Sequence, residues 1–274
     1  MVKDDILNSD LLYTWASVSD ELGHKLHCHA EYEIYYFIEG DVEYRLEGHP
    51  YILTPESLLL IPPNSVHGVT IKSKALHRRV SIHFLPELLD EAERALLLEI
   101  FYAPHLYYPD LSKTRIGLLV QSVLDCKNMD AALQKVALKH RAITLLTCIY
   151  QLHSQNTASP VPRNERIQAI LKYLNDNLSK SVSLDQLSEE FYISKNHLNV
   201  IFHRETGTTV NQYIRIKRLN LAQQEIWKGC TAEEAAYRVG FNDYSNFYRA
   251  YKTLFGIMPS AQAHEWQGIH KSTY

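Results

Sequence analysis

The residues best suited to hold a ligand lie near the start of the chain. His27, His29 and Glu33 have the same parity, so on one unbroken strand their side chains would face one side. Imidazole nitrogens and a carboxylate bind divalent transition metals such as Zn, Fe, Mn or Ni, and they also hydrogen-bond polar molecules. Tyr35 continues the same face, and an aromatic wall beside a few polar groups suits a sugar. The pattern predicts a polar site for a metal ion or a small effector.

A second chemically informative pattern occurs twice in the last third of the chain. Residues 183–207 and 231–256 each contain a capping box, a short helix, a turn, a second N-cap and a second helix that ends at a glycine. Two copies of helix–turn–helix are typical of DNA-binding proteins, although a plain helix bundle would show the same caps.

Between the copies, residues 210–227 follow a continuous helical pattern. Eighteen residues give a helix of roughly 27 Å, close to the roughly 34–36 Å between successive major-groove faces on one side of DNA. One chain could therefore place two recognition helices in adjacent grooves. Arg215, Lys217 and Arg218 lie on this connecting helix and are predicted to contact backbone phosphates.

The elements around these sites divide the 274 residues into two halves. Residues 11–84 show short strands with frequent turn signals, and residues 87–153 become helical. The stretch 154–163 contains two prolines and small polar residues, which is typical of a linker. Net charge is −6 over residues 1–153 and +3 over residues 154–274, which suggests two domains with different partners.

Composition excludes several classes of protein. No apolar run approaches 18 residues, and residues 1–10 have no apolar core of the signal-peptide kind, so we expect no membrane association. The four cysteines show no paired spacing and are expected to be free thiols in a reducing cytoplasm.

The last third of the chain resembles the AraC/XylS family of transcriptional regulators. Residues 193–207 and 235–260 resemble the family's two recognition helices, and Arg215-x-x-Arg218-Leu219 with Ala222 matches its connecting helix. The sequence departs from the family pattern only at 261–263, where Ala-Gln-Ala replaces an aromatic residue and an arginine. The resemblance implies a seven-helix DNA-binding domain over residues 166–264, after a linker at 154–165, with helix–turn–helix units at about 184–205 and 232–255.

The resemblance also implies which side chains read base edges. In the first unit they are Asn196, Asn199, Val200 and His203, and in the second they are Tyr244, Ser245, Asn246 and Arg249. The chemistry agrees, because Asn pairs with adenine, Arg pairs with guanine and Val contacts the thymine methyl group.

The front half resembles the cupins, which many regulators of this family use as sensors. His27-x-His29-x₃-Glu33-x₆-Gly40 fits the first cupin motif, and residues 62–67 match part of the second. The resemblance assigns His67 as the fourth metal-ligand position beside His27, His29 and Glu33. Asn64 stands in place of the motif's glycine, and Ile71 in place of its asparagine. Sensor cupins also use such residues to bind an effector without a metal.

These patterns together predict a two-domain α+β protein. Residues 1–153 would form a cupin-like β-barrel with a helical dimerisation segment, and the C-terminal part an all-α double helix–turn–helix domain. The function predicted is a cytoplasmic, homodimeric transcriptional regulator that binds double-stranded DNA and responds to a small molecule, with a sugar favoured. It would contact RNA polymerase if it activates transcription, and it would not be an enzyme. The alternatives are a cupin metalloenzyme, such as a sugar isomerase or dioxygenase, and a constitutive DNA-binding protein whose barrel only dimerises.

Overall fold

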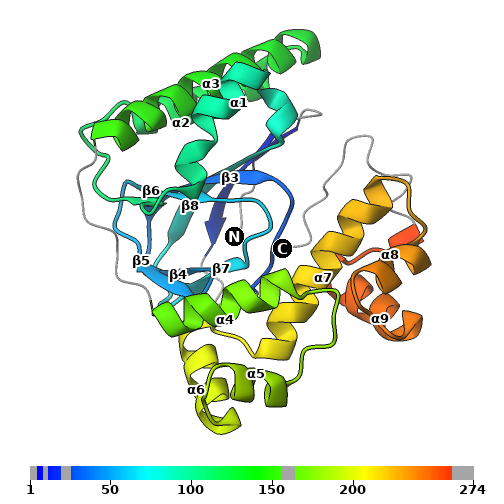
Figure 1. Cartoon of the computed structure of the whole chain (residues 1–274). Helices are drawn as coiled ribbons and strands as arrows, with labels where there is room; N and C mark the ends of the chain where they lie inside the picture. Colours follow the sequence, from blue (N-terminus) through cyan, green and yellow to red (C-terminus); the bar gives the residue numbers. More distant parts are fainter. Residues whose placement is uncertain (1–4, 9–11, 20–25, 156–163, 261–274) are drawn as a thin grey trace.

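The chain folds into two domains (Figure 1). The computed structural model describes residues 5–8, 12–19, 26–155 and 164–260. In this described part, the front domain combines two antiparallel sheets with helices, and the back domain is helical throughout. The predicted two-domain α+β class is confirmed.

The larger sheet of the front domain has six strands in the order β1-β2-β8-β3-β6-β9. Their bounds are β1 Asp5–Asn8, β2 Leu12–Ser19, β3 Tyr32–Glu39, β6 Ser57–Ile61, β8 His77–Phe84 and β9 Tyr107–Tyr108. The smaller sheet has the order β5-β4-β7, with β4 at Val42–Leu46, β5 at His49–Ile52 and β7 at His67–Ile71. Strand β3 lies between β8 and β6, and its first six residues are all buried. Its run of Tyr, Ile and Phe suits a central strand covered on both faces.

Short helical segments and three α-helices complete the front domain on the side away from the back domain (Figure 1). The helices are α1 Glu91–Leu97, α2 Ile116–Leu124 and α3 Ala131–Gln155. The short 3₁₀ segments are η1 Pro86–Leu88, η2 Glu99–Tyr102 and η3 Asp125–Asn128. Leu138, Leu145 and Ile149 on α3 are fully buried and join the same apolar core as the strands. The helices therefore seal that core.

The back domain contains six helices within the described residues. They are α4 Glu165–Asp176, α5 Leu184–Glu190, α6 Lys195–Thr206, α7 Val210–Trp227, α8 Ala232–Arg238 and α9 Tyr244–Phe255. The capping boxes predicted at Ser183 and Thr231 both form. Gly207 and Gly256 end α6 and α9 in the left-handed conformation that glycine adopts without strain. The two helix–turn–helix copies and the connecting helix over residues 210–227 are confirmed.

The predicted linker overlaps the ends of two helices. Helix α3 continues through Ser154 to Gln155, and α4 begins at Glu165. The intervening residues 156–163, like the family departure at 261–263, lie outside the described residues. Within the described chain, no helix combines the length and apolar character needed to cross a membrane.

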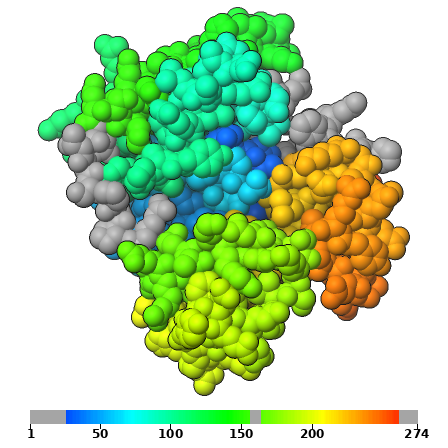
Figure 2. All heavy atoms as spheres, viewed as in Figure 1, coloured from blue at the N-terminus to red at the C-terminus, as the bar shows by residue number. Residues whose placement is uncertain are grey.

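The two domains pack directly against each other (Figure 2). Cys28 and Val66 of the front domain belong to the same apolar core as Ile167, Ile214 and Ile216 of the back domain. The second helix–turn–helix unit has a separate core, which includes Leu219, Ala222 and Phe247. The front domain therefore shares an apolar core with the first helix–turn–helix unit, whereas the second unit has a core of its own.

Candidate functional site

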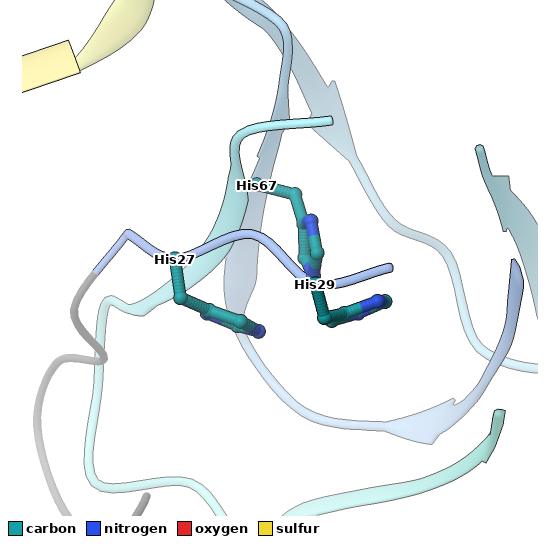
Figure 3. A group of neighbouring side chains, drawn as sticks. All are labelled: His27, His29 and His67. Atoms are coloured by element: carbon teal, nitrogen blue, oxygen red, sulfur yellow. The ribbon is translucent and has the colours of Figure 1, made fainter. Parts of the chain in front are cut away.

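The structure brings the four predicted ligand residues together, and two of the three histidines flank the Glu33 carboxylate. Glu33 Oε2 lies 3.2 Å from His29 Nε2 and 3.3 Å from His67 Nε2. The ring centroids of His27 and His67 are 4.2 Å apart, and Figure 3 shows the rings of His27, His29 and His67 close to one another. Each of these three histidines offers a nitrogen within 4.8 Å of the others.

A fifth residue completes this group, which we call the histidine cluster: His27, His29, Glu33, His67 and His83. His83 Nε2 lies 3.7 Å from Glu33 Oε1, and the His29 and His83 rings are 4.8 Å apart. His83 lies on β8, directly opposite Glu33 in the register of β3 and β8. Sequence reasoning missed His83. Only the pairing of β8 with β3 places His83 beside Glu33, and no local pattern in the sequence specifies that pairing.

The segment that carries His27 and His29 is held to strand β7 by its backbone. His27 and His67 exchange two backbone hydrogen bonds, each 2.9 Å long. The backbone N–H of Asn64 donates to the carbonyl of His29 at 2.7 Å. The histidines thus come from two short segments that are tied to each other.

Burial and charge set the protonation of the cluster. Burial alone would raise the pKa of Glu33, but His83, His29 and His67 hold that pKa well below its usual value. Burial lowers the pKa of His83 to about 3 and also lowers the pKa of His67. Burial opposes a charge on His29, yet Glu33 and Glu31 outweigh it and raise its pKa. His67 and His83 are therefore neutral near pH 7, which is the form that binds a metal through nitrogen.

Tyr35 lies farther along β3, in an aromatic layer next to the cluster. Its side chain is fully buried, and its hydroxyl is 3.0 Å from His77 Nε2. Its ring packs edge-on against Tyr44 at 4.7 Å, and the Tyr44 ring is parallel to that of His67 at 6.3 Å. Tyr35 and Tyr44 are thus closely packed, and the role of Tyr35 in an effector site stays a prediction.

The residues predicted to read DNA lie on α6 and α9. The four on α6 are all exposed, and on α9 three are exposed and Tyr244 is half-buried. Asp243 caps α9 by accepting from the backbone N–H of Asn246, whose side chain accepts a 2.7 Å hydrogen bond from Arg249. The Arg249 guanidinium is therefore held near the N-terminal end of α9, the part of a recognition helix that contacts base edges in the major groove.

The three residues predicted to contact phosphates have different surroundings. Arg215 is exposed and bonds within its own helix to Gln212. Lys217 is 6% exposed, and its ammonium is 2.6 Å from Glu47 of the front domain. Arg218 donates to the carbonyls of Leu178, Lys180 and Gly240. In this arrangement only Arg215 offers its charge to solvent, so the roles of Lys217 and Arg218 at phosphates stay predictions.

Comparison with known proteins matches both domains. A family model described as "AraC-like ligand binding domain" matches residues 19–193, and one described as "Helix-turn-helix domain" matches residues 187–263. The uncharacterized HTH-type transcriptional regulator YbfI of Bacillus subtilis is 28% identical over 234 residues, which cover 80% of each chain. The multiple antibiotic resistance protein MarA of Escherichia coli is 33% identical over 96 residues, covering 34% of this chain and 74% of MarA. A crystal structure of ToxT from Vibrio cholerae aligns at 10% identity over 93% of this chain and 98% of ToxT, with a TM-score of 0.46.

Proposed function

The chain belongs to the AraC family of transcriptional regulators, and we propose that it binds specific DNA sequences and changes its DNA affinity when a small ligand occupies the histidine cluster. The observation that carries the DNA-binding part is the exposure of the predicted reader residues on α6 and α9. Side chains that hydrogen-bond base edges must be free to enter the major groove.

We assign base reading to the eight predicted residues in two groups. The α6 group is Asn196, Asn199, Val200 and His203, and the α9 group is Tyr244, Ser245, Asn246 and Arg249. Arg249 is the strongest candidate, because a guanidinium pairs with the O6 and N7 atoms of guanine. Arg215 is proposed to hold a phosphate, since it lies exposed between the two units.

Selection of bound duplexes from a random library, using the full chain, would supply the operator for the test. We expect Arg249→Ala to lose about 1–3 kcal/mol on the selected operator and to relax preference at one base pair. Arg215→Ala is the matched control, because it should weaken selected and random duplexes alike. Equal loss on both duplexes for Arg249→Ala would remove Arg249 from the readers.

For the ligand, the residues fit a divalent transition metal. Imidazole nitrogens with a carboxylate are a common donor set for such ions. His29 belongs to two triads whose ligand atoms lie within 4.8 Å of one another, one with His27 and His67 and one with Glu33 and His83. His27, His29, His67 and Glu33 would hold the ion, with His83 as a further nitrogen donor. The ion would act as the effector that the sensor domain detects.

Elemental analysis of the purified full chain tests this assignment. We expect near-stoichiometric metal, which the double variant His29→Ala/His67→Ala should lose. His140→Ala, an exposed histidine on α3, is the matched control and should retain the metal. Metal that persists in the double variant would refute the site.

A carbohydrate is the effector that the aromatic residues predict. Tyr35 is buried, its hydroxyl is bonded to His77 and its ring packs edge-on against Tyr44. Because these contacts already cover the ring, the packing supports a compact ion better than a stacked sugar ring. Calorimetric titration of the full chain with monosaccharides tests the sugar. Heat that disappears in Glu33→Gln would favour a carbohydrate at the same cluster.

We propose that the protein is a regulator rather than an enzyme, that it acts in the cytoplasm as a homodimer, and that it contacts RNA polymerase if it activates. Leu118 on α2 and Leu133 and Val136 on α3 are exposed apolar side chains on the segment expected to dimerise. Sedimentation of Leu118→Glu beside the unchanged chain tests that interface. Isomerase or oxygenase turnover by the metal-loaded full chain would instead support the cupin-enzyme alternative.

A further inference from the structure

The two domains are joined by a compact polar contact beside the histidine cluster. It involves two residues of the front domain and four residues of α7. We call this group the interdomain latch: Glu47, Asn64, Tyr213, Lys217, Asn220 and Gln224. Glu47 accepts 2.6 Å hydrogen bonds from both the Lys217 ammonium and the Tyr213 hydroxyl.

Lys217 depends on this contact. Its side chain is 8% exposed, and its ammonium also donates to the backbone carbonyl of Asn64. A lysine is rarely buried without a partner, and removing one member of a buried pair leaves an uncompensated charge. As long as the domains stay docked, the charge of Lys217 is neutralised by the front domain and is kept from DNA.

Asn64 connects the latch to the histidine cluster. Its side-chain oxygen accepts 2.6 Å hydrogen bonds from Asn220 and Gln224 of α7, while its backbone N–H donates to the His29 carbonyl. Its φ of 60° is in the left-handed region that glycine and asparagine tolerate. Asparagine therefore meets the backbone requirement of a glycine position and adds a side chain that reaches the DNA-binding domain.

The segments that carry the histidines have two faces. His27 and His29 point into the cluster, whereas Cys28 between them packs in the core of the DNA-binding domain, with its sulfur 3.9 Å from the carbonyl of Ile216. The same alternation places His67 in the cluster and Val66 in that core. A displacement of either segment toward Glu33 is therefore a displacement away from α7.

We propose that a ligand in the histidine cluster opens the interdomain latch and so frees Lys217 to bind DNA. The proposal rests on the proposed function, because it takes the cluster to be the effector site. The segment that carries His27 and His29 also carries Cys28, and the segment that carries His67 also carries Val66 and Asn64. A ligand that repositions these two segments therefore also moves Cys28, Val66 and Asn64 relative to α7.

The latch is tested first without any ligand. Asn64→Gly keeps the left-handed backbone and removes only the side chain that holds α7, so the chain should still fold. We expect N-ethylmaleimide to label Cys28 at least tenfold faster in Asn64→Gly and in Glu47→Gln than in the unchanged chain. Cys126, buried in the core of the front domain, is the internal control and should label at an unchanged rate. Unchanged labelling of Cys28 in both variants would overturn the latch.

DNA binding provides the second readout. On a random 30-base-pair duplex, one freed phosphate contact should steepen the salt dependence of the logarithm of the binding constant by about 0.9, which is about eightfold tighter binding at 0.1 M salt. We expect this gain in Asn64→Gly and its loss in the double variant Asn64→Gly/Lys217→Met. A gain that survives removal of Lys217 would overturn the role of that lysine.

Coupling to the cluster is tested with one equivalent of Ni²⁺ added to the full chain. We expect faster labelling of Cys28 and tighter binding to the duplex, and no change in His29→Ala/His67→Ala. Ni²⁺ that binds at the cluster but leaves Cys28 labelling unchanged or slower would overturn the coupling. If Ni²⁺ does not bind, only the assignment of a metal ion as the effector is refuted. Cys28 labelling and DNA binding of the Asn64→Gly and Glu47→Gln variants then test the latch.

Discussion

Arg218 offers the sharpest test of how the back domain is held together. Sequence reasoning assigns it to a DNA phosphate, whereas in the structure it joins the segment before the first helix–turn–helix unit to the turn of the second unit. Its guanidinium donates to the carbonyls of Leu178 and Lys180 on one side, at 2.7 Å each, and to that of Gly240 on the other, at 2.8 Å.

The cost of removing Arg218 follows from these three bonds. A hydrogen bond from a charged donor contributes roughly 1.5–3 kcal/mol when it is protected from water. The bond to Lys180 is exposed and contributes little, while those to Leu178 and Gly240 are partly buried and count at the low end of the range. We therefore expect Arg218→Ala to lower the free energy of unfolding of the back domain by about 3 kcal/mol.

Urea unfolding of the full chain, followed by far-ultraviolet circular dichroism, measures this loss. Arg218→Lys should lose nearly as much, because an ammonium cannot reach three carbonyls in a fork. Arg215→Ala, on the same helix but exposed, is the control and should change stability by less than about 0.5 kcal/mol. The reasoning fails if both Arg218 variants unfold like the unchanged chain. A drop of about 0.9 in the salt dependence of DNA binding for Arg218→Ala would then support a phosphate contact instead.

Four further substitutions test the local structure in and beside the helix–turn–helix units by urea or thermal unfolding. Gly240→Ala should destabilise the protein by about 2–5 kcal/mol, because φ is 95° and the new Cβ would lie 2.7 Å from the Ser179 carbonyl oxygen. Gly229→Ala is the control, because its φ of 98° is similar but its new Cβ would meet open space, and it should lose only about 1–2 kcal/mol. Equal losses for the two variants would refute the steric argument. Thr231→Ala should lose about 1 kcal/mol through its capping box, and an unchanged midpoint would show that the cap contributes nothing. Tyr192→Gly should raise the melting temperature slightly, since Tyr192 is 95% exposed at φ 50° and gives up strain of about 1 kcal/mol; a lower melting temperature would contradict this.

The helical half of the fold could be predicted because its signals are local. A capping box such as Ser183-x-x-Gln186 satisfies the first backbone donors of its own helix, so it marks a helix start without reference to the rest of the chain. The same holds for Gly207 and Gly256, whose positive φ ends each second helix where the sequence predicted it. Tertiary packing did not need to be known for these elements.

The site could be predicted only in part, because its remaining contacts join distant segments. Parity placed His27, His29 and Glu33 on one face, yet β3 begins at Tyr32, and the segment before it reaches the cluster through its bridge to His67. His83 depends on the register of β8 against β3, which no local pattern specifies. Lys217 lies between Arg215 and Arg218 in the sequence, a basic cluster that is typical of an exposed face, and only docking against Glu47 buries it.

The sharing of one apolar core between the domains limits how such a protein can be recombined. Cys28 and Val66 complete the core that contains Ile167, Ile214 and Ile216. A chimera joined at the linker would therefore keep only one of the two surfaces that pack together in this core. The second unit has its own core, so its recognition helix is free to diversify toward new half-sites without disturbing the sensor. Successful domain exchange, in evolution or in the laboratory, should therefore conserve the partners of α6 and α7 while α9 varies.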